Sequence, residues 1–206
     1  MGRTRRVGLL AATLATGVVG LRLVRRIAAR AHTTGAANLT PQVPSRDPAR
    51  LTVEVRAHAE AAEVDPVLLM TILHVESYKP HGPLLERAWQ ALRRDSAFGV
   101  ANMHRRTYER TRFNRPFADR AWKELPDDPD LAIRAAAWHL HDLQAQLPDS
   151  TDGPYTRDEL IAMGYNTGPR NMLRFANGRQ PGPQARAYLD RLREQREPAQ
   201  QALLPE

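Results

Sequence analysis

The residues whose types suit proton chemistry begin with a glutamate at the end of an apolar stretch. Glu76 closes the run that starts at Asp65 and Pro66, and Ser77 follows it directly. A carboxyl group in an apolar setting keeps its proton to a higher pH than one in water, so it can act as a general acid near neutral pH. An isolated glutamate at such a position is ordinarily a solvated helix end, so the interpretation depends on what accompanies it.

Two further segments follow Glu76 in a defined order. Residues 96–102 read S-A-F-G-V-A-N and are followed by Thr107, and residues 164–169 read G-Y-N-T-G-P. Together with the Glu-Ser pair they resemble the pattern of the lytic transglycosylase and goose-type lysozyme group. That pattern runs E-S, then G-L-M-Q with a threonine five residues on, then A-Y-N-A-G-P.

The resemblance implies an all-α, lysozyme-like fold with a two-lobed substrate cleft, and an enzyme that cuts the glycan strands of bacterial peptidoglycan. In this group a glutamate protonates the oxygen of the MurNAc-GlcNAc β-1,4 bond while the acetamido group of the muramic sugar assists departure. The sugar's C6 hydroxyl then attacks the anomeric carbon and gives up its proton to the same glutamate. The resemblance assigns these acid and base roles to Glu76 and predicts a 1,6-anhydroMurNAc product.

The resemblance also implies a set of substrate-binding positions. In the family the tyrosine of A-Y-N points its hydroxyl at the catalytic carboxyl, and the asparagine helps to fix the loop and the substrate. The serine before the glycine segment hydrogen-bonds near the carboxyl, and a late T-R-x-Y segment, matched here by A-R-A-Y, provides a cleft tyrosine. The matching residues are Ser77, Ser96, Asn102, Tyr165, Asn166 and Tyr188.

The sequence departs from the family pattern in several places. Asn102 stands where the family has glutamine, which keeps the amide donor and acceptor but shortens the side chain by one methylene. Gly164 and Thr167 replace the alanines of A-Y-N-A. The stretch between Glu76 and the glycine segment is longer than expected, and it includes Trp89, which is either a platform for a sugar ring or a core residue.

Two alternative functions remain open from the sequence. The first is a muramidase that hydrolyses the bond with water and uses Asp95 or Glu86 as the second carboxylate. The second is a domain that binds glycan or a cell-wall partner without cutting it, which the change at Asn102 and the long insertion favour. The intact Glu76, Tyr165 and Asn166 argue against this second alternative.

The composition excludes several other classes of protein. The formal net charge is +7, but seven of the 30 basic residues lie in the first 30 positions, which contain no acidic residue. The remainder holds 23 basic and 23 acidic residues, whereas nucleic-acid binding requires a clustered basic face. Nucleic acid is therefore not an expected partner. The lack of cysteine excludes disulfides, a thiol nucleophile and thiolate zinc sites.

The chain is expected to contain a leader, a linker, a domain and a tail. Residues 1–31 combine arginines with an uncharged apolar stretch of signal-peptide length, shorter than the roughly 20 residues of a membrane span, and predict a signal peptide or membrane anchor. A basic amphipathic helix is the alternative. Residues 32–48 predict a Pro/Thr/Gly-rich linker, residues 49–197 the transglycosylase-like domain, and residues 198–206 a flexible tail. We therefore expect an exported or membrane-anchored monomer that faces the cell wall and contacts the membrane through its N-terminal segment.

Helical periodicity extends over nearly the whole expected domain. No run of alternating β-branched residues predicts a strand, which leaves at most a small hairpin or irregular lobe between residues 78 and 102. Helices are expected at 49–64, 66–76, 84–93, 105–112, 129–146, 157–164, 169–176 and 183–195.

No cofactor or metal is expected from the sequence. His139 and His141 are two residues apart on a predicted helix, so their side chains diverge by about 200° and do not form a simple shared site. His139 is more consistent with a packed position. The acidic loop at residues 127–130 lacks the regular ligand spacing of a calcium loop and instead favours helix capping.

Overall fold

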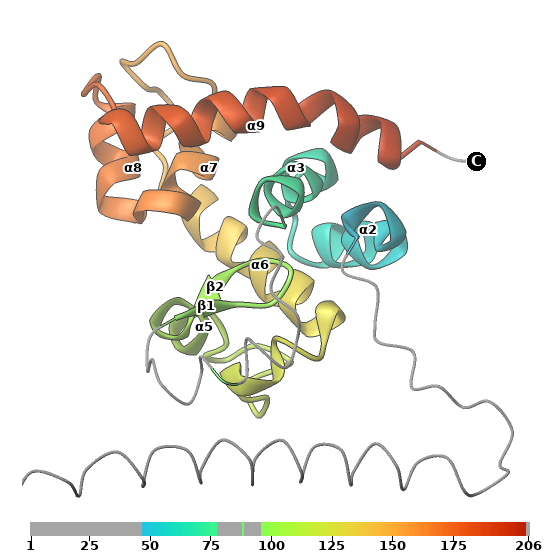
Figure 1. Cartoon of the computed structure of the whole chain (residues 1–206). Coiled ribbons are helices and arrows are strands. Elements are labelled where there is room, and N and C mark those ends of the chain that lie inside the picture. The colour runs from blue at the N-terminus through green and yellow to red at the C-terminus, as the bar shows by residue number, and fades with distance from the viewer. Residues whose placement is uncertain (1–46, 78–87, 89–95, 205–206) are drawn as a thin grey trace, which may run out of the picture. The chain divides into compact units, whose positions relative to one another are not determined.

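The computed structural model describes residues 47–77, 88 and 96–204 of the chain (Figure 1). The chain divides into two units, Met1–Gln42 and Val43–Glu206, and the described residues all belong to the second unit. Within these ranges no helix combines the length and the apolar character needed to cross a membrane.

Several sequence predictions fall on residues outside the described ranges. They include the expected leader and almost all of the linker, together with the helix predicted between the Glu76 and Gly99 segments apart from its residue 88. The candidate sugar platform Trp89 and both candidate second carboxylates, Asp95 and Glu86, also lie outside the described residues. These remain predictions.

Helices make up most of the described structure, so the predicted all-α class is confirmed. A two-stranded antiparallel sheet accompanies them in the part of the chain that is described. The elements are η1 Pro48–Arg50, α2 Thr52–Ala61, α3 Pro66–Glu76, β1 Ala97–Phe98, β2 Met103–His104, α5 Arg105–Thr111, η2 Trp122–Glu124, α6 Pro129–Gln144, α7 Arg157–Thr167, α8 Pro169–Ala176 and α9 Pro183–Ala202.

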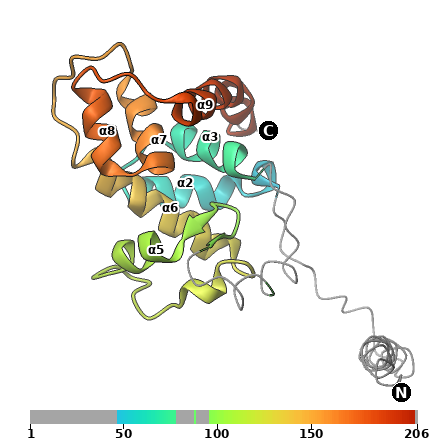
Figure 2. The ribbon, with the colours of Figure 1, turned by 60° about the vertical axis from the view of Figure 1, so that its left-hand side comes forward.

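Helix α3 lies at the centre of the domain. Asp65 caps its start by accepting a hydrogen bond from the Val67 N–H at 2.9 Å. Pro66 occupies the first turn, where an N–H would have no partner within the helix. Its apolar residues surround nearly the whole circumference, and those from Leu68 to Leu73 are buried. Figure 2 shows α3 between α9 and the other helices, and its most extensive packing is with α9.

A short hairpin and helix α5 form the core of a second lobe below α3 in Figure 1. Phe98 pairs with Met103 across the hairpin, and residues 99–102 form its turn. Trp122 fixes this hairpin because its indole N–H donates to the Met103 carbonyl at 3.2 Å and its ring lies 5.0 Å from that of Phe98. The sequence allowed a small hairpin between residues 78 and 102, and the hairpin in the structure continues to His104.

The first predicted helix is interrupted in the structure. Leu51 separates η1 from α2, and the second of these ends at Ala61 instead of continuing to residue 64. Glu63 adopts a φ of 54°, and the Val64 N–H bonds to the Ala59 carbonyl at 3.0 Å, which gives a Schellman-type end. No glycine marks this end, so the sequence pattern did not reveal it.

Helix α7 runs one turn further than predicted and includes the Tyr-Asn pair. The Gly168 N–H bonds to the Gly164 carbonyl at 2.7 Å, and Gly168 then leaves the helix with a φ of 88°. A Cβ atom on Gly164 would lie 2.7 Å from the sulfur of Met172 and 3.1 Å from its Cβ. Gly164 therefore replaces the family's alanine at a place where Met172 occupies the space.

The C-terminal helix α9 also extends beyond its predicted end near residue 195. Residues 198–206, expected to be a flexible tail, are helical as far as Ala202 even though Pro198 lies inside the helix. Ala199 is fully buried, and Leu203 packs against the core while its carbonyl accepts a hydrogen bond from Arg56. Packing against the core therefore outweighs the local composition of this segment.

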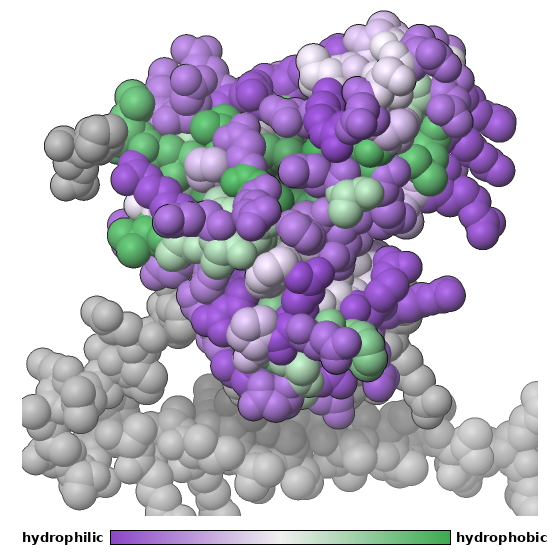
Figure 3. Space-filling view, turned by 180° about the vertical axis from the view of Figure 1, so that it is seen from behind, coloured by the Kyte–Doolittle hydropathy of each residue, from purple (hydrophilic) through white to green (hydrophobic). Residues whose placement is uncertain are grey.

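The rear surface of the domain in Figure 3 is mostly hydrophilic, with apolar patches between the polar side chains. Among the large apolar residues described, those most exposed are Val53, Phe113 and Leu204, at 75%, 74% and 62%. They lie on separate segments of the chain, and single exposed apolar residues of this kind are normal in soluble domains.

Replacing Gly99 by alanine should destabilise the hairpin lobe. Gly99 has a φ of 76°, and an added Cβ would lie 2.7 Å from the backbone oxygen of Leu125. Strain and overpacking together should reduce the free energy of unfolding by roughly 2 to 4 kcal/mol, measured by urea denaturation. Gly182→Ala is the matched control, because its φ is −71° and no atom lies within 4 Å of the added Cβ. Equal stability of the two variants would contradict this account of the turn.

Candidate active site

Glu76 is the last residue of α3, and only 8% of its surface is exposed. The preceding residue, Val75, is 2% exposed, so the end of the helix remains in the interior of the domain. The position therefore differs from a solvated helix end. A carboxyl group in such a place requires hydrogen-bond donors from other segments of the chain.

Asn102 provides one of these donors from the hairpin turn. Its Nδ2 donates to Oε2 of Glu76 at 2.7 Å. The Asn102 backbone has a φ of 47°, a left-handed conformation that asparagine adopts more readily than most residues, and its N–H bonds to the Gly99 carbonyl at 3.0 Å. The asparagine that replaces the family's glutamine therefore bonds directly to Glu76.

Tyr165 approaches the same region from the last turn of α7. Its hydroxyl donates to the carbonyl of Ala101, the residue before Asn102, at 2.6 Å. Burial raises the pKa of Tyr165 well above its ordinary value, and the negative charge of Glu76 raises this pKa further. Tyr165 is therefore near the carboxyl, as the sequence pattern implies, but its hydroxyl bonds to the backbone beside Asn102.

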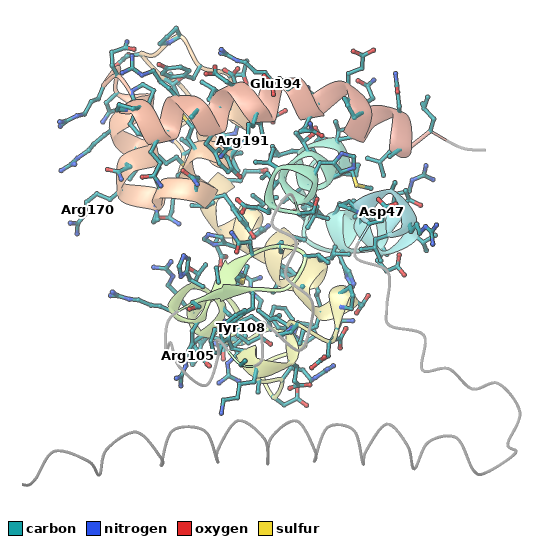
Figure 4. The ribbon with its side chains drawn as sticks, viewed as in Figure 1. Asp47, Arg105, Tyr108, Arg170, Arg191 and Glu194 are labelled. Carbon is teal, nitrogen blue, oxygen red and sulfur yellow. The ribbon has the colours of Figure 1, made fainter. Side chains whose placement is uncertain are left out.

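Tyr188 reaches Glu76 from α9 and is 1% exposed. Burial raises its pKa well above the ordinary value, and the next largest cause is the charge of Glu76. Its hydroxyl also lies within hydrogen-bonding reach of the Glu76 carboxylate, which raises this pKa further. Arg191 partly opposes this shift, and its guanidinium carbon lies 5.9 Å from the centre of the Tyr188 ring. Figure 4 places Arg191 on the side of α9 that faces the other helices.

An asparagine and two tyrosines from three other segments are thus gathered around the buried carboxyl of Glu76. The family model described as Transglycosylase SLT domain matches residues 54–187, which contain all of these residues except Tyr188. The chain belongs to this family. SLT domains are typically found in lytic transglycosylases, which act on peptidoglycan. No curated protein and no solved structure matches the chain.

Three predicted site residues of this SLT domain make no described contact with Glu76. The Ser77 hydroxyl donates to the His74 carbonyl at 3.1 Å and so completes the helix end. Ser96 precedes β1, is partly exposed and forms no hydrogen bond with another described residue. Asn166 lies on α7 beside Tyr165, and its Oδ1 is buried without a partner among the described residues.

Two residues near the site were not assigned to it from the sequence. His139 on α6 is 6% exposed and lies with its ring 5.4 Å from that of Tyr165. Arg191 lies three residues after Tyr188, and this helical spacing is the signal that could have identified it. For His139 the sequence pattern predicted a packed position, which the structure confirms.

The described part of the domain offers no group of three or more histidine or acidic side chains positioned to hold a metal ion. His141 Nδ1 lies 2.8 Å from the Ala62 carbonyl, so this nitrogen carries the proton and donates. Asp128 accepts from the Leu131 N–H at 3.0 Å and caps α6. The acidic loop before α6 therefore has the capping role that its sequence favours.

The bond between Asn102 and Glu76 should be measurable as a coupling free energy. Asn102→Gly keeps the left-handed backbone available and removes the amide donor, so it should cost about 1 to 3 kcal/mol in the free energy of unfolding. A double-mutant cycle with Glu76→Gln should give a non-zero coupling energy. Asn114→Gly is the matched control, because Asn114 is exposed and has a φ of 57°. A cycle with no coupling would show that the two side chains do not interact.

Stability should also decrease as the pH rises above about 10, the ordinary pKa of tyrosine. Tyr165 and Tyr188 keep their protons to a higher pH in the folded chain than in the unfolded chain, so the folded state binds more protons in this range. The free energy of unfolding must then fall with increasing pH. Burial also raises the pKa of Tyr108, to about 12, so this residue contributes to the same decrease.

Tyr188→Phe tests the contribution of one of these groups. Removing one titrating group should reduce the slope of stability against pH by up to about 1.4 kcal/mol per pH unit above pH 10. Urea denaturation between about pH 9 and pH 11 measures both slopes. An unchanged slope would mean that Tyr188 ionises as easily in the folded chain as in the unfolded one.

Proposed function

We propose that this SLT domain is a lytic transglycosylase that cleaves the MurNAc-GlcNAc β-1,4 bond, with Glu76 as general acid and then general base. The observation that carries the proposal is the buried Glu76 carboxyl with the Asn102 amide on its Oε2 atom. An enclosed, oriented carboxyl is what protonation of a glycosidic oxygen requires.

The surroundings of Glu76 favour a mechanism with one carboxylate. In the described part of the chain, Glu76 is the carboxylate whose charge acts on both Tyr165 and Tyr188, and no other acidic side chain does so. A hydrolase of the usual kind would need a second carboxylate within roughly 5 to 10 Å. The muramidase alternative assigns this second carboxylate to Asp95 or Glu86, which lie outside the described residues.

The proposed reaction has two proton transfers through the same group. Glu76 first gives its proton to the glycosidic oxygen, the bond to the anomeric carbon breaks, and GlcNAc leaves with that proton. The C6 hydroxyl of the muramic sugar then forms a bond to the anomeric carbon, and its proton passes to the Glu76 carboxylate. Asn102 would hold the carboxyl in one orientation through both steps.

In this proposal the substrate is bound by four further residues, Asn166, Tyr188, Ser77 and Ser96. The buried Oδ1 of Asn166 lacks a hydrogen-bond partner among the described residues. Leaving a buried polar atom without a partner costs about 1 to 3 kcal/mol, which a donor or acceptor on a bound sugar would recover. Because peptidoglycan lies outside the cytoplasmic membrane, the proposal also places the domain outside it, through export or an N-terminal membrane anchor.

The first test is mass spectrometry of the products that the full chain releases from purified peptidoglycan. Products with 1,6-anhydroMurNAc ends are expected, and Glu76→Gln should reduce their rate of formation by at least about a thousandfold, because it removes the only proposed acid and base. Circular dichroism should show that the variant remains folded. Glu159→Gln is a matched control, since Glu159 caps α7 and pairs with Arg193 at 2.7 Å.

The other outcomes separate the alternatives. Reducing ends in place of anhydro ends would contradict the transglycosylase and indicate hydrolysis, with Asp95 and Glu86 as the next residues to replace. Binding of the folded chain to peptidoglycan without any product would instead favour the non-catalytic domain.

A further inference from the structure

A cavity of about 330 Å³ lies where α5, α6 and the start of α8 meet. Arg110 of α5, His139 of α6 and Pro169 of α8 contribute to its lining. The Tyr165 ring connects this cavity to the candidate active site, because His139 lies against it at 5.4 Å and Glu76 acts on its hydroxyl. A group in the cavity would therefore lie one aromatic ring away from the catalytic region.

His139 is a buried polar side chain that lines this cavity without a described partner. It is 6% exposed and has no hydrogen bond with another described residue. Burial, assisted by the charge of Arg110, lowers the pKa of His139 to about 4. The ring is therefore neutral near pH 7 and can donate one hydrogen bond into the cavity.

The charges around the cavity favour an anion. Arg110 is exposed and forms no ion pair within the described part of the chain. The first turn of α8 carries no acidic residue and begins at Pro169, which lines the cavity, so the positive end of this helix lies beside it. Asp142 also lines the cavity, but its carboxylate is bound by Arg115 at 2.6 Å.

The exposed surface of α8 also carries positive charge. The sequence contains no acidic residue between Leu160 and Leu189, and Arg170 and Arg174 are exposed on α8. Figure 4 shows Arg170 pointing away from the start of this helix. Among the described residues that line the cavity, Asp142 is thus the only carboxylate, and Arg115 pairs with it.

We propose that this cavity binds a carboxylate group carried by the muramic sugars of the substrate, with Arg110 and His139 as its ligands. This proposal rests on the proposed function, because the connection through Tyr165 makes the bound anion part of the glycan being cut. The carboxylate belongs either to the peptide attached to the muramic sugar or, on peptide-free strands, to the lactyl group itself. The site would select which part of the wall is cleaved.

Binding to defined glycan fragments tests the proposal independently of cleavage. The full chain carrying Glu76→Gln is titrated by calorimetry with three fragments: a peptide-bearing tetrasaccharide, the same compound with its peptide carboxylates amidated, and the peptide-free form. Arg110→Gln in the same background should weaken the binding of carboxylate-bearing fragments by about 5- to 20-fold. It should leave the amidated fragment unchanged.

Matched variants separate a local effect from a general loss of charge. Arg50→Gln removes the same charge from η1, where the side chain is 76% exposed, and should change no affinity. His139→Gln retains a donor and should weaken carboxylate binding less than His139→Phe. A weaker affinity for the peptide-bearing fragment alone would identify the peptide as the source of the carboxylate, and an equal effect on the peptide-free fragment would identify the lactyl group.

The proposal and the proposed function fail in different ways. Equal affinities for all three fragments, or affinities that Arg110→Gln leaves unchanged, would overturn the carboxylate site even if anhydro products are released. The absence of binding to every fragment would overturn it as well. If no product is released while the Arg110-dependent preference persists, the cleavage fails and the carboxylate site stands.

Discussion

The burial of the Glu76 carboxyl is the constraint on which the rest of the site depends. A carboxyl group inside a protein must be matched by hydrogen-bond donors, because an unmatched one costs far more than a lost surface contact. The Asn102 amide supplies such a donor at 2.7 Å. Since the two residues come from different lobes of the domain, this bond also links the central helix α3 to the hairpin.

The position of that donor is determined by packing further away. Asn102 needs a left-handed backbone, which the hairpin turn provides, and Gly99 allows the turn to approach the Leu125 carbonyl. Trp122 then fixes the strand after the turn through its bond to the Met103 carbonyl. The orientation of the Asn102 amide therefore depends on Gly99 and Trp122, which have no described contact with the Glu76 carboxyl.

Tyr165 contacts two regions of the domain and so connects the surroundings of Glu76 to the cavity. Its hydroxyl bonds to the hairpin beside Asn102, while its ring lies against His139 and the cavity that Arg110 also lines. In the proposals made above, proton transfer takes place near the hydroxyl of Tyr165, and the anionic substrate group binds in the cavity next to its ring. The arrangement would allow binding in the cavity to influence where the glycan is cut without adding a second carboxylate near Glu76.

The sequence by itself determined the all-α class, the apolar helix that ends at Glu76, and the family, because local periodicity, the Asp-Pro cap and short motifs are properties of neighbouring residues. It could not determine that the Asn102 amide bonds to Glu76 or that the Tyr165 hydroxyl bonds to Ala101. Nor did it reveal the end of α2 at Ala61 or the continuation of α9 past Pro198. Only the tertiary structure decided these features, since each depends on contacts between residues far apart in the chain, whose free energies outweigh local preference.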